Sequence, residues 1–351
     1  MPSAKTLPNN HPGEIILFNF PESVFGRRMT RYFNLRSLPY SQIRVPPNMP
    51  RPILQEKLGI NYRRIPIMAI GRDIYIDTRI MLPKLEKFFP EKRLGAQGHF
   101  DAGFEAMLEE FVIDGGPFWR TAGCIPETAP FMQNEVWMKD RSDGSGGQFN
   151  KESLRENRTW SLSQLRLWFG ILEKFLADGR KWISRTEGPS LSDIHAGWQA
   201  DWAINMAGDM NDDKGEHSTA DMRRVLSRDE FPNVHAWVER FRKATNEAES
   251  ANKSAGALDE GKEAGDEIVK RILSSEFTEA ESPVVDESDV LGLKKGQRIS
   301  IAPVDFGFTH KDQGTLVGLA KDEVVIEIDV PGDNGKLRLH YPRINFKILP
   351  V

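Results

Sequence analysis

The chain of 351 residues is long enough for two or three domains, each with a hydrophobic core of its own. Its hydrophobic fraction of 39% and charged fraction of 28% are those of a soluble globular protein. The net charge of −4 argues against nucleic acid as a main partner, and no apolar run approaches the roughly 20 residues that cross a bilayer.

Cysteine and histidine usage bounds the chemistry further. Cys124 is the single cysteine, so neither an intrachain disulfide nor a cysteine-rich zinc site can form. The histidines lack the spacing of metal ligands, which predicts no bound metal. Residues 1–13 are polar and punctuated by proline, without the basic-then-apolar pattern of a signal peptide. These features predict a cytoplasmic protein in a reducing compartment, with no membrane as partner.

The first part of the chain alternates between predicted strands and helices. The compact apolar run Glu14–Phe20 predicts a first, buried strand. Ser23 follows it as a natural N-cap for a helix. Residues 38–45 predict a second strand, and a proline-rich loop covers residues 46–52. The order is therefore strand, helix, strand and loop.

The next stretch carries the densest set of signals. Two apolar runs, Ile65–Ile70 and Ile74–Ile76, flank Gly71–Asp73, which is typical of a hairpin turn. Pro66 stands at the start of the first run. It therefore belongs to an edge strand, to the first residue of a strand or to a cis bond in a tight bend. Asp77–Thr78 then begins a helix with apolar residues at helical spacing.

A strand pair opened by proline and followed by a hydroxyl-capped helix resembles the glutathione-binding half of a thioredoxin-like domain in the glutathione transferase superfamily. In that family this proline is cis. Residues 23–29 (Ser-Val-Phe-Gly-Arg-Arg-Met) resemble the family's first-helix motif, which places Ser23 at the thiol-activating position. The chain departs from the family at Val24, where proline is common, and at Asp77-Thr78, where Glu-Ser or Gln-Ser is usual.

The resemblance implies a serine-type catalytic site. The hydroxyl of Ser23 would donate a hydrogen bond to the sulfur of glutathione, at the positive end of a helix. Arg27 and Arg28 would add positive potential if either faces the site. Read without the resemblance, Ser23 is a plain N-cap with no ligand. The absence of cysteine at position 23 disfavours thiol–disulfide exchange, which needs a protein thiolate.

The resemblance also implies a binding site for the rest of the tripeptide. Ile65 would pair through its main chain with the peptide backbone of glutathione, beside Pro66. Thr78, at a helix N-terminus, would receive the α-carboxylate, and Asp77 would hold the α-ammonium. On their own, Asp77 and Thr78 form an ordinary helix start.

From Gly98 to about Lys243 the signal turns helical. Ser190 and Asp193 predict a structural capping box, and the surrounding Pro-Ser-x-x-Asp-Ile run resembles the start of the central helix in the all-α domain of glutathione transferases. Residues 231–238 resemble the entry to that domain's last helix. Several residues are expected to serve packing rather than ligand binding: Cys124, Trp160, Trp168, Phe169, Phe175 and His195.

Beyond residue 244 the composition changes twice. Between Glu247 and Asp289 thirteen acidic residues face four basic ones, so the rest of the chain sums to about +5 (−4 minus −9). This stretch predicts an acidic linker with a short helix near residues 264–273. Five short strand patterns then follow, which predict a small antiparallel β-barrel of the SH3-like kind. They cover residues 298–301, 315–319, 324–328, 336–341 and 346–349.

The predicted fold class is a multidomain α+β protein. It has a thioredoxin-like α/β domain (13–92), an all-α domain (93–244), the linker (245–289) and a small antiparallel β-barrel (290–351). The order resembles a subgroup of fungal transferase-like proteins with a C-terminal extension.

The predicted function is that of a serine-type glutathione transferase, with glutathione as co-substrate and a small electrophile as second substrate. Two alternatives stay open. One is a non-catalytic transferase-like scaffold that uses the C-terminal region to recruit partners, and the other is a carrier of apolar ligands. Members of the family are commonly homodimers.

Overall fold

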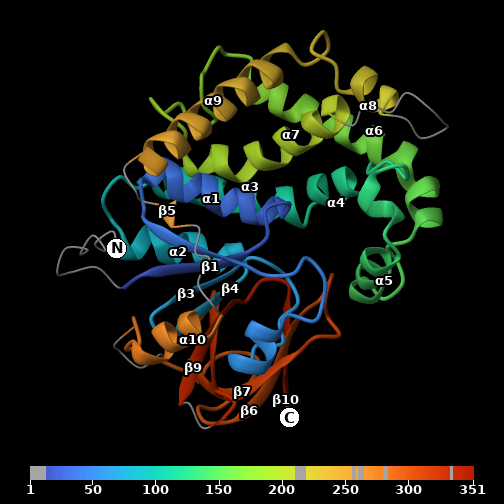
Figure 1. Ribbon diagram of the computed structural model, residues 1–351. Coiled ribbons are helices and arrows are strands. Elements are labelled where there is room, and N and C mark those ends of the chain that lie inside the picture. Colours follow the sequence, from blue (N-terminus) through green and yellow to red (C-terminus); the bar gives the residue numbers. More distant parts are fainter. Residues whose placement is uncertain (1–12, 210–218, 255–257, 260–264, 280–283, 333–334) are drawn as a thin grey trace. The chain divides into compact units, whose positions relative to one another are not determined.

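The computed structural model describes residues 13–209, 219–254, 258–259, 265–279, 284–332 and 335–351 (Figure 1). It divides into two compact units. The sheet unit comprises residues 1–29, 39–92 and 256–351, and the helical unit comprises residues 30–38 and 93–255. The predicted linker segments 255–257, 260–264 and 280–283, and residues 1–12, lie outside the described residues.

The N-terminal part of the sheet unit follows the predicted order. Strand β1 leads into helix α1, whose first residues belong to the sheet unit, and β2 then pairs with β1 in parallel. Strands β3 and β4 form the expected hairpin, with the turn at Gly71-Arg72, and α2 follows directly. This order is that of a thioredoxin-like domain. The elements are β1 Ile15–Asn19, α1 Val24–Arg36, β2 Tyr40–Arg44, the short π-helix η1 Ile53–Lys57, β3 Ile67–Ile70, β4 Asp73–Ile76 and α2 Thr78–Phe88.

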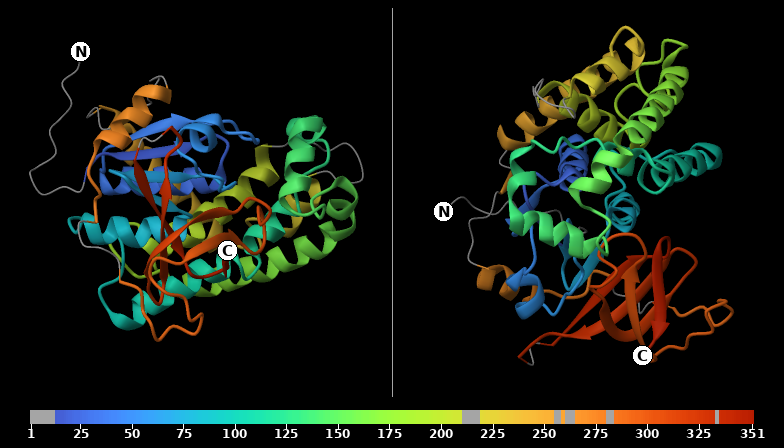
Figure 2. Two further views of the ribbon diagram at one scale, coloured as in Figure 1. Left: turned by 90° about the horizontal axis from the view of Figure 1, so that it is seen from below. Right: turned by 90° about the vertical axis from the view of Figure 1, so that its right-hand side faces the viewer.

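The five predicted C-terminal strands are all present, but they do not form a closed barrel. Neighbouring strands pair antiparallel in the order β10-β6-β7-β8-β9, and β9 then pairs in parallel with β4. The described strands thus make one open, mixed, ten-stranded sheet (Figures 1 and 2). The barrel prediction needs this correction because β4 occupies the edge of β9 that closure would require. The strands are β6 Arg298–Pro303, β7 Asp312–Leu319, β8 Glu323–Asp329, β9 Lys336–Pro342 and β10 Phe346–Pro350.

One hydrophobic core joins the two ends of the chain. Side chains from the N-terminal strands, such as Phe18 and Ile67, belong to the same buried cluster as Leu316, Ile326 and Leu339 from the C-terminal strands. The C-terminal strands therefore do not pack as a free-standing domain. Their apolar face is buried against the thioredoxin-like part of the chain.

Part of the predicted acidic linker is also packed. Helix α9 (Pro232–Ser254) continues into the predicted linker, and α10 (Gly265–Ser274) buries Ile268 and Ile272 in the core of the sheet unit. The short strand β5 (Leu258–Asp259) pairs in parallel with β2. The apolar residues of α10 stand among many acidic ones. The composition of the stretch alone therefore indicated a linker.

The helical unit contains the predicted long helices. Buried side chains of α6 include Trp168 and Phe169, as expected, whereas Trp160 is 48% exposed. That residue lies on the outer face of α6, where the Arg120 guanidinium stacks 3.7 Å from its ring centroid. The described helices are α3 His99–Ile113, α4 Pro117–Ala122, η2 Pro130–Gln133, α5 Glu135–Gly144, α6 Lys151–Leu176, α7 Leu191–Asp209, α8 Ala220–Val225 and α9 Pro232–Ser254.

No helix in the described part of the chain combines the length and the hydropathy that a membrane crossing needs.

Candidate functional site

The strand register brings the three predicted site segments to the same end of strands β1, β3 and β4. Phe18 near the end of β1 lies opposite Ile67 at the start of β3, and Ile67 lies opposite Ile76 at the end of β4. The turn that carries Ser23 follows β1, and the helix that begins at Thr78 follows β4. Segments that are distant in sequence therefore converge at this end of the sheet, as the family resemblance implies.

Ser23 caps helix α1. Its Oγ accepts a hydrogen bond from the backbone N–H of Gly26 at 3.0 Å, and its own carbonyl accepts from the Arg27 N–H. The residue is 7% exposed, and its hydroxyl proton has no acceptor among the described residues. The N-cap expectation is confirmed. The same hydroxyl retains one hydrogen that it can donate.

The two arginines of the first helix differ in position. Arg27 is exposed, whereas Arg28 is 1% exposed and its Nη1 donates to the Thr78 hydroxyl at 2.8 Å. The sequence left open which arginine faces the site. The structure places Arg28 against the start of α2, where its fixed charge raises the local positive potential.

Ile65 and Pro66 precede β3 and are joined by a cis peptide bond. Both residues are buried. The N–H and C=O of Ile65 make no hydrogen bond with any described residue. A backbone donor and acceptor are thus available just before the start of β3, as pairing with an extended peptide requires.

The Asp77 carboxylate is in contact with cations of the chain itself. Arg79 engages both carboxylate oxygens: its N–H and Nε donate to Oδ1 at 3.0 and 3.2 Å, and its Nη2 donates to Oδ2 at 3.2 Å. Oδ2 also faces Tyr62 Oη at 3.5 Å and Arg64 Nη1 at 3.6 Å. Burial alone would raise the pKa of Asp77, but the Arg79 and Arg64 guanidinium groups lower it. The carboxylate has little capacity left for an ammonium group.

Thr78 opens α2 and is 2% exposed. Its hydroxyl accepts from Arg28, and its N–H has no partner among the described residues. An N–H group and a hydroxyl at a helix N-terminus, beside a guanidinium, form a local anion-binding arrangement.

Sequence reasoning missed Tyr62 and Arg64, which complete the surroundings of Asp77. Arg64 also donates through Nε to the Phe306 carbonyl at 2.8 Å and forms an ion pair with Asp305. The only signal was the Arg63-Arg64 pair directly before Ile65-Pro66. Its partners come from a loop more than two hundred residues away, which no local pattern indicates.

The remaining singled-out residues have structural surroundings. Asp193 accepts from the N–H of Ser190 at 2.9 Å, which is one half of the predicted capping box. The Ser190 hydroxyl also donates to the same carboxylate, at 2.6 Å. His195 is buried and its Nδ1 lies 3.5 Å from Glu109 Oε1. Burial raises the pKa of the Cys124 thiol to about 12, so this residue is a poor nucleophile.

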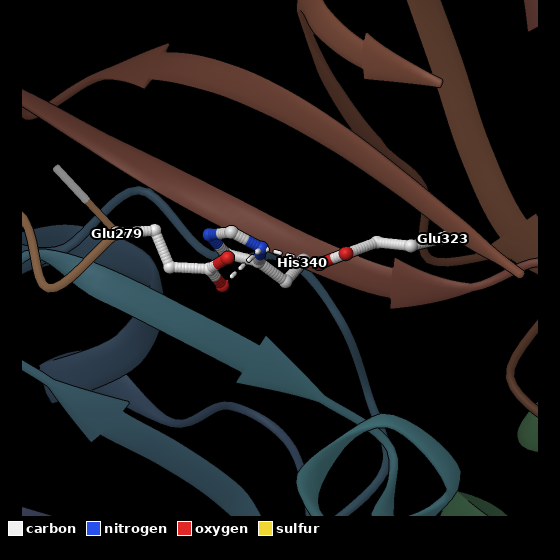
Figure 3. A group of neighbouring side chains, drawn as sticks. All are labelled: Glu279, Glu323 and His340. Carbon is white, nitrogen blue, oxygen red and sulfur yellow. Dashed lines mark hydrogen bonds and ion pairs between the residues drawn. The ribbon is translucent and has the colours of Figure 1, made fainter. Parts of the chain in front are cut away.

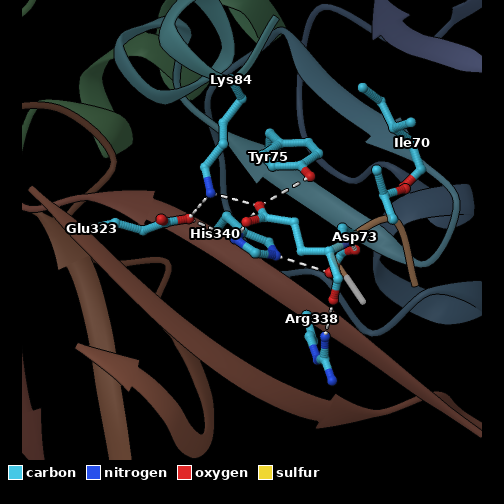
Figure 4. A network of polar contacts seen from close by, with 9 residues as sticks. Ile70, Asp73, Tyr75, Lys84, Glu323, Arg338 and His340 are labelled. Atoms are coloured by element: carbon cyan, nitrogen blue, oxygen red, sulfur yellow. Dashed lines mark hydrogen bonds and ion pairs between the residues drawn. The ribbon is translucent and has the colours of Figure 1, made fainter. Parts of the chain in front are cut away.

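A second polar cluster joins β4 to the C-terminal strands. His340 on β9 lies between Glu279 and Glu323, and the ligand atoms of the three residues are within 4.8 Å of one another (Figure 3). The Lys84 ammonium already lies 2.5 Å from Glu279 Oε1 and 2.8 Å from Glu323 Oε1 (Figure 4). Both nitrogens of His340 are also taken, by Glu323 at 2.6 Å and Asp73 at 2.9 Å. We assign this cluster as a salt-bridge network and place no metal there.

Comparisons with known proteins bear on both units. Residues 17–93 match the family model for the glutathione S-transferase N-terminal domain, and residues 120–250 match a domain of unknown function (DUF7962). No curated protein matches the chain.

The structure is similar to that of a GST-like protein from Pseudomonas syringae, with a TM-score of 0.69 and 19% identity, over 97% of this chain and 100% of the other. A glutathione transferase family member from Pseudomonas fluorescens pf-5, with two glutathione bound, aligns at 18% identity and a TM-score of 0.47, over 69% of this chain and 94% of its own. Beta-etherase LigF from Sphingobium sp. strain SYK-6 aligns at 16% identity and a TM-score of 0.49, over 68% and 99%.

The fold is thus a thioredoxin-like domain combined with a helical region and an added set of C-terminal strands. Residues 17–93 are similar to the glutathione S-transferase N-terminal domain, and the chain has the fold of the GST-like protein described above.

Proposed function

We propose that the chain binds glutathione and activates its thiol with Ser23 for attack on a small electrophile. The proposal rests on the convergence of Ser23, Ile65 and Thr78 at one end of the sheet. Each of them has a hydrogen-bonding group without a partner among the described residues. The matched N-terminal domain supports it.

Each group would serve one part of the tripeptide. The N–H and C=O of Ile65 would pair with the glutathione backbone, and the N–H and hydroxyl of Thr78, with Arg28 beside them, would bind the α-carboxylate. We assign Asp77 to positioning the first turn of α2, because Arg79 and its neighbours already saturate its oxygens.

The chemistry would begin with loss of the thiol proton to solvent. A free thiol has a pKa of about 8.5, and lowering it by about two units takes roughly 2.7 kcal/mol of preferential thiolate stabilisation. The Ser23 hydroxyl, at the positive end of α1, would donate to the sulfur. The thiolate would then form a C–S bond to the electrophilic carbon, and the leaving group would depart with its electron pair.

The test distinguishes the role of Ser23 as N-cap of α1 from its role in activating the thiol. Glutathione binding is measured by calorimetry, and the pKa of the bound thiol is measured from its ultraviolet absorbance. Ser23→Thr should keep a lowered thiol pKa. Ser23→Gly, which retains most of the capping energy, should return that pKa to the free value. A lowered pKa in the glycine variant would exclude Ser23 as the activating group, and absence of binding to the wild type would refute the proposal.

A non-catalytic role in ligand binding is the second candidate. One observation favours it: Ser23 is a buried residue, and its Oγ is already engaged by the Gly26 N–H. In that case glutathione would bind with an unchanged thiol pKa in the wild type as well.

A further inference from the structure

The C-terminal strands contact the candidate site directly, through a loop and two strands. The loop between β6 and β7 supplies Asp305 and the Phe306 carbonyl, and both bind the Arg64 guanidinium. The Phe306 ring also lies 5.3 Å from the guanidinium of Arg63. Gly307 allows the close approach, since it has a φ of +81° and a Cβ there would lie 3.2 Å from Arg63 Cβ.

Strands β7 and β10 hold the residues just before Arg64. Asp312, 1% exposed on β7, accepts from the Asn61 N–H at 2.6 Å and from the Tyr341 hydroxyl at 2.6 Å. The Tyr62 ring stacks on Phe346 of β10, with ring centroids 6.1 Å apart. The segment that leads into Ile65-Pro66 is therefore fixed by the C-terminal region.

These contacts converge on Asp77. Its φ of +78° is unusual for a non-glycine residue, and such a conformation persists only where its surroundings over-determine it. Arg64 Nη1 and Tyr62 Oη both face its Oδ2, while its Oδ1 accepts from the Arg79 N–H. The carbonyl of Asp77 in turn accepts from the N–H groups of Ile80 and Met81. The orientation of Asp77 thus sets the first turn of α2, where the Thr78 N–H has no partner among the described residues.

We propose that the C-terminal strands are a clamp for this site, in which Asp305 holds Arg64, and Arg64 holds Asp77 and the N-terminus of α2 in the form that binds a carboxylate. Arg64 and Asp305 are positioning residues in this scheme. The inference rests on the proposed function for the identity of the ligand, which is glutathione. The structural part of the clamp can be measured without any ligand.

The binding experiment uses the full chain and glutathione in a calorimeter. Asp305→Asn should weaken binding about threefold to tenfold, and Arg64→Gln about tenfold or more, because the second change leaves Asp77 without one of its cations. Adding Asp305→Asn to Arg64→Gln should have no further effect. The matched control, Asp322→Asn, removes an exposed carboxylate from another loop of the C-terminal strands and should bind as the wild type does.

The ligand-free experiment follows hydrogen exchange at the Ile80 and Met81 amides. Exchange there should accelerate in Asp305→Asn and Arg64→Gln but not in Asp322→Asn, while amides at the C-terminal end of α2 keep their wild-type rates. Arg64→Lys keeps the charge but loses the planar guanidinium, and it should give an intermediate exchange rate. It provides a second test in case the glutamine variant does not fold.

The outcomes separate the two proposals. Unchanged exchange at these amides in both variants, or additive losses of affinity in the double variant, would overturn the clamp. If the wild type does not bind glutathione but the exchange rates change as expected, the clamp stands and the proposed function fails.

Discussion

His340 is expected to be the main electrostatic contact between the N-terminal and C-terminal strands of the sheet unit. It is fully buried on β9, with Asp73 of β4 on one ring nitrogen and Glu323 of β8 on the other. Tyr75 of β4 stacks on the ring with centroids 4.8 Å apart, and Lys84 of α2 neutralises the carboxylates on the other side (Figure 4). Glu279, from the segment after α10, lies 3.6 Å from His340 Nδ1.

Replacing His340 by glutamine removes a cation from between two carboxylates, and Asp73 is itself fully buried. Breaking a buried pair by removing one partner costs about 3–5 kcal/mol, since the remaining charge is left uncompensated. The Lys84 ammonium stays near Glu323, so the loss falls mainly on Asp73. We therefore expect a loss in that range in the free energy of unfolding of the sheet unit.

The loss should depend on pH. Burial alone would lower the pKa of His340, but its hydrogen bonds to Asp73 and Glu323 raise it above the usual value of about 6.5. The stabilisation by the protonated ring is complete below about 6.5 and is lost as the pH rises through the raised folded pKa. Glu323 has a lowered pKa. Burial opposes this shift, and His340 and Lys84 cause it, so its contribution is lost as the pH falls through that lowered value. The difference between wild type and variant should be largest in weakly acidic solution.

The assay must report on the sheet unit itself. All eight tryptophans lie between residues 119 and 237, in the helical unit, so their fluorescence is unsuitable. Hydrogen exchange at the amides of β4 and β9 measures the opening free energy where the change is made. Lys336→Gln, which breaks a surface ion pair between Lys336 of β9 and Glu327 of β8, is the control and should leave exchange unchanged. A loss in His340→Gln that is the same at every pH from about 5 to 9 would refute the assignment of a protonated histidine.

Three further predictions concern other parts of the chain. Asp193→Ala should lower the melting temperature followed by tryptophan fluorescence, with a cost of about 3 kcal/mol or more, because the Trp237 indole N–H and other buried donors lose their acceptor; an unchanged melting temperature would contradict this. Cys124 should resist a thiol reagent at about pH 8 until the protein unfolds, since burial raises its pKa to about 12, and rapid labelling of the native protein would show the site to be open. Gly71→Ala should cost about 1–3 kcal/mol in urea unfolding, because φ is +59° there and a Cβ would overlap the Glu276 carbonyl; full stability would mean that the segment after α10 can move away.

Local patterns predicted the local structure well. The run before Pro21 formed β1, the hairpin around Gly71 formed as expected, and all five C-terminal strand patterns became strands. Alternating or clustered apolar residues and capping side chains act over a few residues, so a single sequence reveals them. The site segments could be proposed only because the resemblance supplied their order.

What failed was long-range pairing. Nothing in the sequence shows that β9 aligns with β4, so antiparallel strands suggested a closed barrel. Likewise, the acidic composition around α10 concealed two apolar residues that enter the core. Asp77 was expected to hold an ammonium group, whereas Arg79 and Arg64 contact its oxygens, and Arg64 is itself paired with Asp305, which is distant in sequence. Such contacts depend on the assembled sheet, and periodicity carries no information about them.

The pairing of β4 with β9 affects how the protein can be produced and shortened. A chain that stops before residue 290 would leave β4 unpaired on the side away from β3, and the apolar face of the sheet open to water. During synthesis residues 290–351 must follow before this side of β4 is covered, which favours early self-association or chaperone capture. Deletion of the C-terminal strands would therefore report on aggregation before it reported on any partner, and point substitutions are the cleaner tool for assigning their role.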